Sequence, residues 1–198
     1  MNVSRETLAR LQVYTALLQK WNPAINLVAK LTLPDLWQRH FEDSAQLMDL
    51  CPQNATTWCD LGSGGGFPGL VVAIMARDTH PQLRVTLVES DQRKATFLRT
   101  VAREAGTEVA IRAERAETLA PQNADVVSAR ALAPLPLLLG HVHRHLKPGG
   151  AAILPKGANA DKELEEALAT WRFKVQKTPS KTDPQAVILT IGELTRAG

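Results

Sequence analysis

Cysteine is scarce in this sequence: Cys51 and Cys59 are the only two among 198 residues. They do not form a CxxC pair, so the sequence predicts neither a disulfide framework nor a zinc site. Long apolar runs are also missing, and residues 1–6 lack the apolar core of a signal peptide. We therefore expect a cytoplasmic protein that has no membrane partner.

An excess of charge of one sign is missing as well. Lysine and arginine number 23 against 20 aspartates and glutamates, which gives a net charge of +3. This balance permits a polyanionic partner but does not require one. The hydrophobic content of 44% is typical of a globular protein, and the length suits one well-packed core. We expect a single domain over residues 1–198, with a helical extension at 1–50 and a core at 55–198.

The most informative stretch is residues 60–69, Asp-Leu-Gly-Ser-Gly-Gly-Gly-Phe-Pro-Gly. It lies between a strand-like run and an apolar run that can start a helix. Closely spaced glycines let the backbone approach a ligand where a Cβ atom would clash. The spacing fits Gly62-x-Gly64-x-Gly66, as in S-adenosylmethionine (SAM) sites, and also Gly64-x-Gly66-x-x-Gly69, as in dinucleotide sites.

Two acidic residues bear on this choice of cofactor. Asp60 lies at the end of the strand-like run, where its carboxylate can accept a hydrogen bond from an ammonium group such as that of SAM. The pyrophosphate of a dinucleotide would be repelled there. Glu89 ends the next strand-like run, where a carboxylate can bind both hydroxyls of a ribose, which both cofactors contain. The alternative is that Glu89 only caps the next helix and that the glycines only make a turn.

Beyond the glycines, strand-like and helix-like runs alternate, which indicates a mostly parallel, Rossmann-like sheet with helices on both faces. The predicted strands cover residues 56–61, 84–89, 108–113, 124–128, 151–155, 172–177 and 186–191. Arg130 and Lys156 follow the ends of the fourth and fifth strands. Ligands bind at this edge of open α/β sheets, so both cations are candidates for the site.

Two helices are expected before the first strand. The first begins at the N-cap Ser4 and is stopped by the Asn22-Pro23 pair, because proline disfavours helical geometry in the residue before it. The second covers residues 32–48 and carries several charges on one face, with His40 near its edge. The plain interpretation of that face is contact with solvent.

A short histidine series lies on the helix predicted before the fifth strand. His141 and His145 are four residues apart and share a face, with His143 between them. No carboxylate or cysteine is spaced as a third ligand, so we predict no metal. A solvated helix end, near the negative pole of the helix dipole, explains the histidines better.

Several further motifs point to one family. They are Trp21-Asn22 with Asn26-Leu27, Arg39-His40-x-x-Asp43-Ser44, Asp60-x-Gly62-x-Gly64-x-Gly66-Phe67-Pro68-Gly69, Arg93-Lys94 with Phe97-Leu98, Arg115-Ala116-Glu117, Arg130-Ala131 and Lys156-Gly157. In these motifs the chain resembles the bacterial methyltransferases that modify a guanine at N7 in small-subunit ribosomal RNA, known as the glucose-inhibited division protein B family. The resemblance covers most of the chain, and it implies a class I SAM-dependent methyltransferase fold with seven strands.

The residue patterns and the resemblance together give a set of expected site residues. Two cations would be catalytic, namely Arg130 and Lys156. SAM would be bound by Asp60, Gly62, Gly64, Gly66, Phe67, Glu89, Ala116, Glu117 and Arg130. The RNA would be contacted by Asn26, Arg39, His40 and Lys156. The chain departs from the family pattern at Ala129, where serine is usual, and at Gln185-Ala186, where a basic residue is usual.

The implied reaction makes modest chemical demands. Guanine N7 already has a lone pair in the plane of the ring, so no base has to remove a proton, and catalysis can be mainly positioning. O6 lies on the same edge as N7. A cation such as Arg130 or Lys156 can therefore hold O6 and a nearby phosphate while leaving N7 free. The alternative for each cation is a surface salt bridge.

Three functions are weighed. The first is a SAM-dependent methyltransferase for 16S ribosomal RNA or the small ribosomal subunit, acting as a monomer. The second is an NAD-type oxidoreductase that uses the Gly64-x-Gly66-x-x-Gly69 spacing. Asp60 argues against it, and so does the lack of residues for a separate substrate domain. The third is a non-catalytic, ribosome-associated module that keeps SAM as a structural or regulatory ligand.

Overall fold

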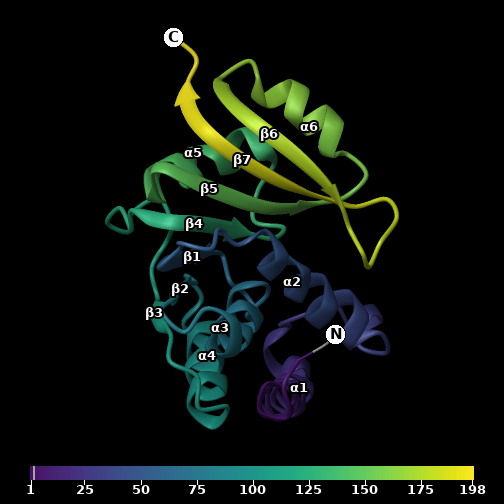
Figure 1. Cartoon of the computed structure of the whole chain (residues 1–198). Helices are drawn as coiled ribbons and strands as arrows, with labels where there is room; N and C mark the ends of the chain where they lie inside the picture. Colours follow the sequence, from purple (N-terminus) through teal and green to yellow (C-terminus); the bar gives the residue numbers. More distant parts are fainter. Residues whose placement is uncertain (2) are drawn as a thin grey trace.

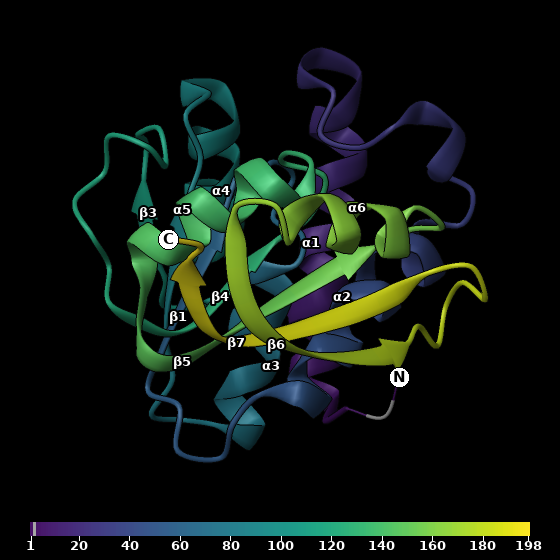
Figure 2. The same ribbon diagram turned by 90° about the horizontal axis from the view of Figure 1, so that it is seen from above.

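The computed structural model describes residue 1 and residues 3–198. Seven strands form one sheet in the order β3-β2-β1-β4-β5-β7-β6, in which β7 alone runs antiparallel to its neighbours (Figure 1). Figure 2 shows β7 lying between β5 and β6. The strands are β1 Thr57–Leu61, β2 Arg84–Val88, β3 Ala110–Arg112, β4 Ala124–Ala129, β5 Leu146–Lys156, β6 Trp171–Pro179 and β7 Val187–Arg196.

Helices cover both faces of this sheet. The α-helices are α1 Arg5–Ile25, α2 Asp43–Ala45, α3 Gly69–Thr79, α4 Gln92–Glu104, α5 Leu135–His145 and α6 Ala160–Ala167. Successive strand residues point to opposite faces. Trp58 packs with the core formed under α1, α3 and α4, whereas Cys59 packs with the core formed under α5 and α6. The expected seven-stranded, mostly parallel sheet with helices on both faces and an N-terminal helical extension is confirmed.

Helix α1 begins where the sequence predicts and ends later. Ser4 is the N-cap, since its Oγ accepts a hydrogen bond from the Thr7 N–H at 3.0 Å. The predicted stop at Asn22-Pro23 is wrong, because Pro23 lies inside the helix. The Asn22 Oδ1 accepts from two N–H groups just beyond the helix, at 2.8 Å each, and Asn26 ends the helix in the left-handed region with φ of 48°. These bonds offset the loss at proline.

The single helix predicted over residues 32–48 is also wrong. The segment is a 3₁₀ turn at Lys30–Thr32, a π-helix at Trp37–Glu42, the short α2, and a 3₁₀ turn at Gln46–Leu50. A π-helix widens the turn, and such bulges are frequent at functional sites. Here it turns His40 inward, so that this side chain is buried and not at the edge of a solvated face.

The glycine loop between β1 and α3 is packed directly against α1. Tyr14 of α1 donates its O–H to the Gly65 carbonyl oxygen. A Cβ on Gly66, whose φ is +96°, would collide with the Tyr14 hydroxyl. The N-terminal extension therefore supports the backbone of the loop from below. Such a contact needs glycine, because no side chain fits in the gap.

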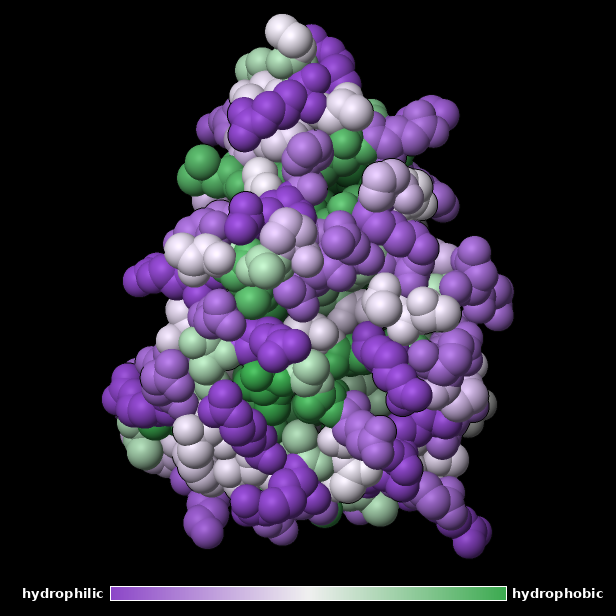
Figure 3. Space-filling model, turned by 90° about the vertical axis from the view of Figure 1, so that its left-hand side faces the viewer, coloured by the Kyte–Doolittle hydropathy of each residue, from purple (hydrophilic) through white to green (hydrophobic). Residues whose placement is uncertain are grey.

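The surface at the amino ends of the parallel strands, on the left of Figure 1, is covered mostly by hydrophilic residues, with apolar residues showing in a few patches (Figure 3). In the part of the chain that the structure describes, no helix combines the length and the apolar character that a bilayer span requires.

Candidate active site

Two cavities lie at the carboxyl ends of the parallel strands and share Ala131 and Leu132 in their walls. The smaller one, the cofactor cavity, has a volume of about 300 Å³ and the larger one, the acceptor cavity, about 1170 Å³. The cofactor cavity is lined by five of the residues predicted to bind SAM, namely Gly62, Gly64, Glu89, Ala116 and Glu117. The acceptor cavity is lined by four predicted site residues, namely Arg39, His40, Arg130 and Lys156.

Glu89 lies in the wall of the cofactor cavity and is 7% exposed. Its Oε2 accepts a hydrogen bond from the Gly64 N–H at 2.8 Å, and its Oε1 accepts one from the Asp91 N–H at 2.8 Å. The carboxylate thus fixes both the glycine loop and the start of α4, where Asp91 is the N-cap. Each carboxylate oxygen can accept a further hydrogen bond, so Glu89 can support the loop and hold a diol together.

Helix α5 fixes the loop that carries Ala116 by hydrogen bonding to its backbone. His145 is fully buried, and its Nε2 lies 2.7 Å from the Ala116 carbonyl oxygen. A carbonyl only accepts, so Nε2 carries the proton. Nδ1 is buried with no partner among the described residues, and burial lowers the pKa of the imidazole. The prediction of a solvated helix end is therefore wrong for His145, although His143 is exposed.

Asp60 has a different environment from the one expected. It is fully buried and lines neither cavity. Its Oδ1 accepts from the Ser128 hydroxyl at 2.6 Å, and its Oδ2 accepts from the Gly69 N–H at 3.2 Å. Burial raises the pKa of Asp60 to about 6, against the effect of these hydrogen bonds. The carboxylate joins β1, β4 and the start of α3, and both its oxygens are already used inside the protein.

Phe67 also differs from its expected place. Its ring is 3% exposed and stacks on Tyr14 with 5.3 Å between ring centroids, so it lines neither cavity. The Arg130 guanidinium also lies near this ring, with its Cζ 5.1 Å from the ring centroid. This is within the range of a cation–π contact. Phe67 and Gly66 therefore belong to the support under the site.

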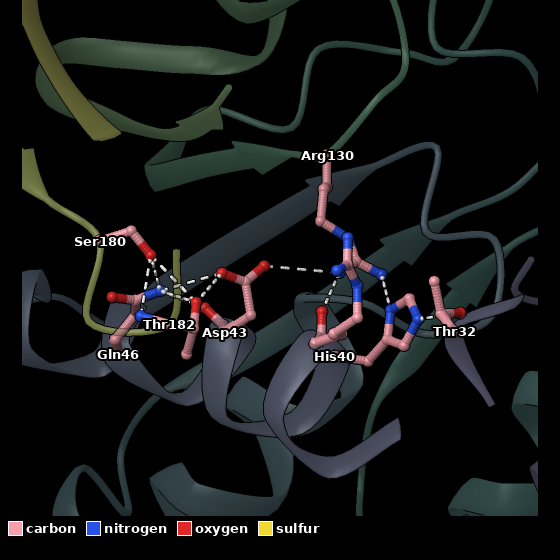
Figure 4. A network of polar contacts seen from close by, with 8 residues as sticks. Thr32, His40, Asp43, Gln46, Arg130, Ser180 and Thr182 are labelled. Carbon is pink, nitrogen blue, oxygen red and sulfur yellow. Dashed lines mark hydrogen bonds and ion pairs between the residues drawn. The ribbon is translucent and has the colours of Figure 1, made fainter. Parts of the chain in front are cut away.

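Arg130 is the centre of a polar network at the floor of the acceptor cavity (Figure 4). Its Nη2 donates to the His40 Nδ1 at 2.9 Å, and its Nη1 donates to the Arg39 carbonyl oxygen at 3.3 Å. Nη1 also lies 3.5 Å from Asp43 Oδ2. Burial lowers the pKa of Arg130, an effect that Asp43 opposes. An arginine stays charged under such conditions, so the site holds one oriented cation.

His40 is held in one tautomer by its two partners. Its Nε2 lies 2.8 Å from the Thr32 Oγ1, and that hydroxyl donates its own proton to the Ala29 carbonyl oxygen at 2.7 Å. Nε2 must therefore be the donor, which leaves Nδ1 as the acceptor for Arg130. Burial and the charges of Arg130 and Arg39 lower the pKa of His40 to about 4. The imidazole is neutral at pH 7 and acts as a support for Arg130.

Lys156 is engaged inside the protein. Its side chain is 11% exposed, and its Nζ lies 2.8 Å from Glu163 Oε2 and donates to the Ala133 carbonyl oxygen at 3.3 Å. The same Glu163 oxygen accepts from the Leu135 N–H at 2.7 Å. The pair thus fixes the segment between β4 and α5 that separates the two cavities. Its charge is neutralised locally, as in the salt-bridge alternative that the sequence left open, although the pair is largely buried.

The two remaining predicted residues differ in position. Arg39 is exposed at the edge of the acceptor cavity, and within the described residues its side chain forms no ion pair. Asn26 lies at the end of α1 and lines neither cavity. Of the predicted RNA contacts, Arg39 therefore has the free charge that a phosphate contact requires.

Solved structures give an independent view of the fold. A methyltransferase from Geobacter sulfurreducens superposes with a TM-score of 0.62 at 14% identity, covering 91% of this chain and 88% of that one. The Thermus thermophilus 16S rRNA N2 G1207 methyltransferase, solved with AdoMet and guanosine, superposes with a TM-score of 0.55 at 16% identity, covering 80% of this chain and 40% of that one. At these identities the likeness concerns the fold.

Sequence relatives are much closer. The family model of rRNA small subunit methyltransferase G matches residues 7–188. A ribosomal RNA small subunit methyltransferase G from Ruegeria sp. is 51% identical over 191 residues, covering 96% of this chain and 93% of the relative. The protein of the same name from Rhodospirillum centenum is 52% identical, covering 99% of this chain and 88% of the relative. The chain therefore belongs to the rRNA small subunit methyltransferase G family.

Proposed function

We propose that this protein transfers a methyl group from SAM to N7 of a guanine in small-subunit (16S) ribosomal RNA. The observation that carries the proposal is the pair of adjoining cavities, one lined by the glycine loop and Glu89, the other by Arg130 and Arg39. A cofactor and an acceptor bound in them meet at the shared wall. The relatives described above are named as methyltransferases of small-subunit ribosomal RNA, and membership of their family supports the proposal.

The residues of the cofactor cavity fit SAM. Glu89 is a nearly buried carboxylate in the wall, suited to the two hydroxyls of a ribose. Ala116 offers a small, buried side chain beside which an adenine has room. Gly62 and Gly64 have φ of +66° and +56°, which favours glycine, and a Cβ on Gly62 would also collide with the Leu132 side chain in the shared wall. When bound, SAM supplies a methyl group on a positively charged sulfur, which an electron pair can attack.

Catalysis by this chain is mainly positioning. Because N7 presents its lone pair without losing a proton, the site needs no general base. Arg130 is fixed on the ring of Phe67, and its guanidinium has N–H groups beyond those used by His40 and Arg39. Those groups can donate to guanine O6, as arginine does in base recognition, while N7 stays unprotonated and free.

The thiols of this chain do not suit a covalent mechanism. Cys59 lies in β1 and is 1% exposed, and burial raises its pKa to about 12. Burial likewise raises the pKa of Cys51 to about 11. A thiol with such a pKa is almost entirely protonated at pH 7 and is a poor nucleophile. Both cysteines therefore serve packing.

Three predicted roles are revised by the contacts described above. Lys156 acts as a positioning residue for the segment that separates the cavities, because its charge is paired with Glu163. Asn26, which was predicted to contact the RNA, ends α1 and lines neither cavity. Asp60 holds the strand ends together beneath the cofactor cavity. Arg39 remains the residue placed to meet a phosphate of the RNA.

The other functions have less support. An NAD-type oxidoreductase would place a pyrophosphate near the glycine loop, yet family membership joins this chain to methyltransferases. A module that only binds SAM would not need an oriented arginine at the floor of a second cavity. We also propose that the enzyme works as a monomer in the cytoplasm, and that its chain folds as a single unit around one sheet.

The experiment is to label small-subunit RNA with radioactive methyl from SAM and to map the product. Methylation at N7 places a positive charge on the guanine, which weakens its bond to the sugar, so borohydride and aniline should cleave the labelled RNA at one guanine. A labelled RNA that resists this cleavage, or a label on a pyrimidine or a 2′-hydroxyl, would contradict N7 specificity. Absence of any transfer, with SAM bound, would favour the non-catalytic module.

A further inference from the structure

The loop between β6 and β7 reaches back across the molecule to the N-terminal helices. Figure 1 shows it descending from the far edge of the sheet beside α2. Four of its residues line the acceptor cavity, namely Thr182, Asp183, Pro184 and Ala186. None of these four residues is a lysine or an arginine, so the loop adds no cationic side chain to the lining of the cavity.

Gln46 fastens the loop to the N-terminal segment. Its Oε1 accepts from the Lys181 N–H at 2.9 Å, and its Nε2 donates to the Ser180 Oγ at 3.1 Å. The side chain is buried, with the whole residue 7% exposed. A buried amide that meets partners at both its oxygen and its nitrogen is costly to displace, so the loop has one preferred position.

Asp43 joins this loop to Arg130. Its Oδ1 accepts from the Thr182 Oγ1 at 2.8 Å and from the Gln46 Nε2 at 3.0 Å. Its Oδ2 faces Arg130 Nη1 at 3.5 Å. The Asp43 and Arg130 side chains are only 19% and 21% exposed, so solvent screens the pair weakly. In Figure 4 this carboxylate lies between the loop on one side and the guanidinium on the other.

We propose that the loop at residues 180–186 is a recognition element for the acceptor RNA, and that Asp43 is a positioning residue that couples this loop to Arg130. The inference rests on the proposed function. Arg130 meets the reacting guanine, and the loop meets the nucleotide beside it. Because one carboxylate holds both, a correctly seated loop and a correctly oriented guanidinium occur together.

The chemistry of the loop indicates what it recognises. Thr182 and Asp183 offer a hydroxyl and a carboxylate, and Pro184 offers an apolar surface. A carboxylate repels phosphate but can accept hydrogen bonds from the amino groups of bases and from ribose hydroxyls. We therefore assign the loop to a base or a ribose of unpaired RNA. The backbone phosphates are left to Arg39, whose exposed side chain also lines the cavity.

The test is a double-mutant cycle on Asp43→Asn and Thr182→Val. The asparagine keeps an oxygen for Thr182 but turns an amide nitrogen to Arg130, and the valine removes only the hydroxyl. Each single change should raise the KM for RNA about tenfold, the effect of one lost hydrogen bond to a charged group. Because both changes cut the same connection, the double variant should be no more than about tenfold worse than the parent.

Further measurements separate this role from a general structural one. The affinity for SAM should stay within about twofold in all variants, since the cofactor cavity is not touched. Thr182→Ser keeps the hydroxyl and should restore the KM of the parent. Asp49→Asn is the matched control, because Asp49 pairs with Lys181 on the surface, at 60% and 72% side-chain exposure. Such an exposed pair contributes little.

Each of three outcomes would overturn a different claim. If the two single changes multiply to about a hundredfold in the double variant, Asp43 does not couple the loop to Arg130 and the inference is overturned. Unchanged KM for RNA in Thr182→Val would overturn the recognition role of the loop. Failure of the parent protein to methylate RNA would instead overturn the proposed function.

Discussion

His145 donates its Nε2–H to the Ala116 carbonyl oxygen across 2.7 Å, and so ties the end of α5 to the loop that lines the cofactor cavity. The neighbouring Arg144 donates its Nε–H to the Leu119 carbonyl oxygen at 3.0 Å. Two consecutive residues of one helix thus fix two carbonyls of the same loop. Helix α5 therefore sets the position of the loop, although His141 is its one residue in the wall of that cavity.

Replacing His145 should weaken SAM binding. His145→Leu fills the same space but leaves the Ala116 carbonyl without its donor, so SAM affinity should fall about tenfold. His145→Gln keeps a side-chain N–H and should bind SAM nearly as the parent does. Isothermal titration with SAM measures both, with His143→Leu, a change at an exposed position, as the control. Equal affinity of the leucine and glutamine variants would contradict this role.

Glu89→Ala should affect the cofactor and the fold together. Loss of hydrogen bonds to the ribose should cost SAM binding about 1.5–3 kcal/mol. The Gly64 and Asp91 N–H groups also lose their acceptor, which should lower the free energy of unfolding by about 1–2 kcal/mol. Calorimetry and urea unfolding measure the two effects. Glu108→Ala, at an exposed surface pair, is the control. Full SAM affinity in the alanine variant would leave Glu89 a purely structural role.

Arg39 and Lys156 should differ in the salt dependence of RNA binding. Arg39 is exposed and its side chain forms no ion pair with the residues that the structure describes, so Arg39→Ala should make the slope of log affinity against log salt shallower by about one unit. Lys156 is neutralised by Glu163, so Lys156→Ala should leave the slope unchanged while lowering the rate of methyl transfer. Filter binding over a range of salt concentrations measures the slopes. A shallower slope in the lysine variant would show that its charge reaches the RNA.

The free energy of unfolding should depend on pH through His40. Its pKa is lowered from 6.5 to about 4 in the folded protein, so its contribution is present above pH 6.5 and is lost as the pH falls towards 4. Between pH 7.5 and 5.0 the parent should lose about 1–2 kcal/mol more than His40→Asn, after allowance for solvent screening. The asparagine oxygen can still accept from Arg130. Urea unfolding at both pH values measures the difference.

The titration of Asp60 changes the free energy of unfolding in the opposite direction over a similar pH range. Its folded pKa is raised from 3.8 to about 6, so its contribution is present below pH 3.8 and is lost as the pH rises through 6. The total pH dependence of the parent is therefore flatter than either residue alone would give. The prediction therefore concerns the difference in pH dependence between the parent and His40→Asn, and not the pH dependence of the parent alone. An identical pH dependence in the two proteins would contradict the neutral, buried state of His40.

Local signals in the sequence were sufficient for most of the fold. Alternating patterns placed the strands, and Ser4 was predicted as the N-cap of α1. The structure confirms this cap, with the Ser4 Oγ accepting from the Thr7 N–H at 3.0 Å. The strong signals are those in which neighbouring residues in the chain decide the structure.

Tertiary contacts decided the rest. Pro23 was expected to stop α1, but the side chain of Asn22 binds the backbone beyond the helix and lets the last turn form. For Lys156 the sequence left open an RNA contact or a salt bridge, and its partner Glu163 lies on the next helix, at a spacing that has no local signature. The burial of His145 could not be predicted from its neighbours in the chain, since the carbonyl that accepts its hydrogen bond is 29 residues away in the sequence.

The acceptor cavity joins segments that lie far apart in the chain. Part of its wall comes from the segment before β1, part from the segments that follow β4 and β5, and part from the loop that precedes β7. The lining of the cofactor cavity, by contrast, ends at His141. While the chain is being synthesised, all residues that line the cofactor cavity therefore emerge before the loop that completes the acceptor cavity.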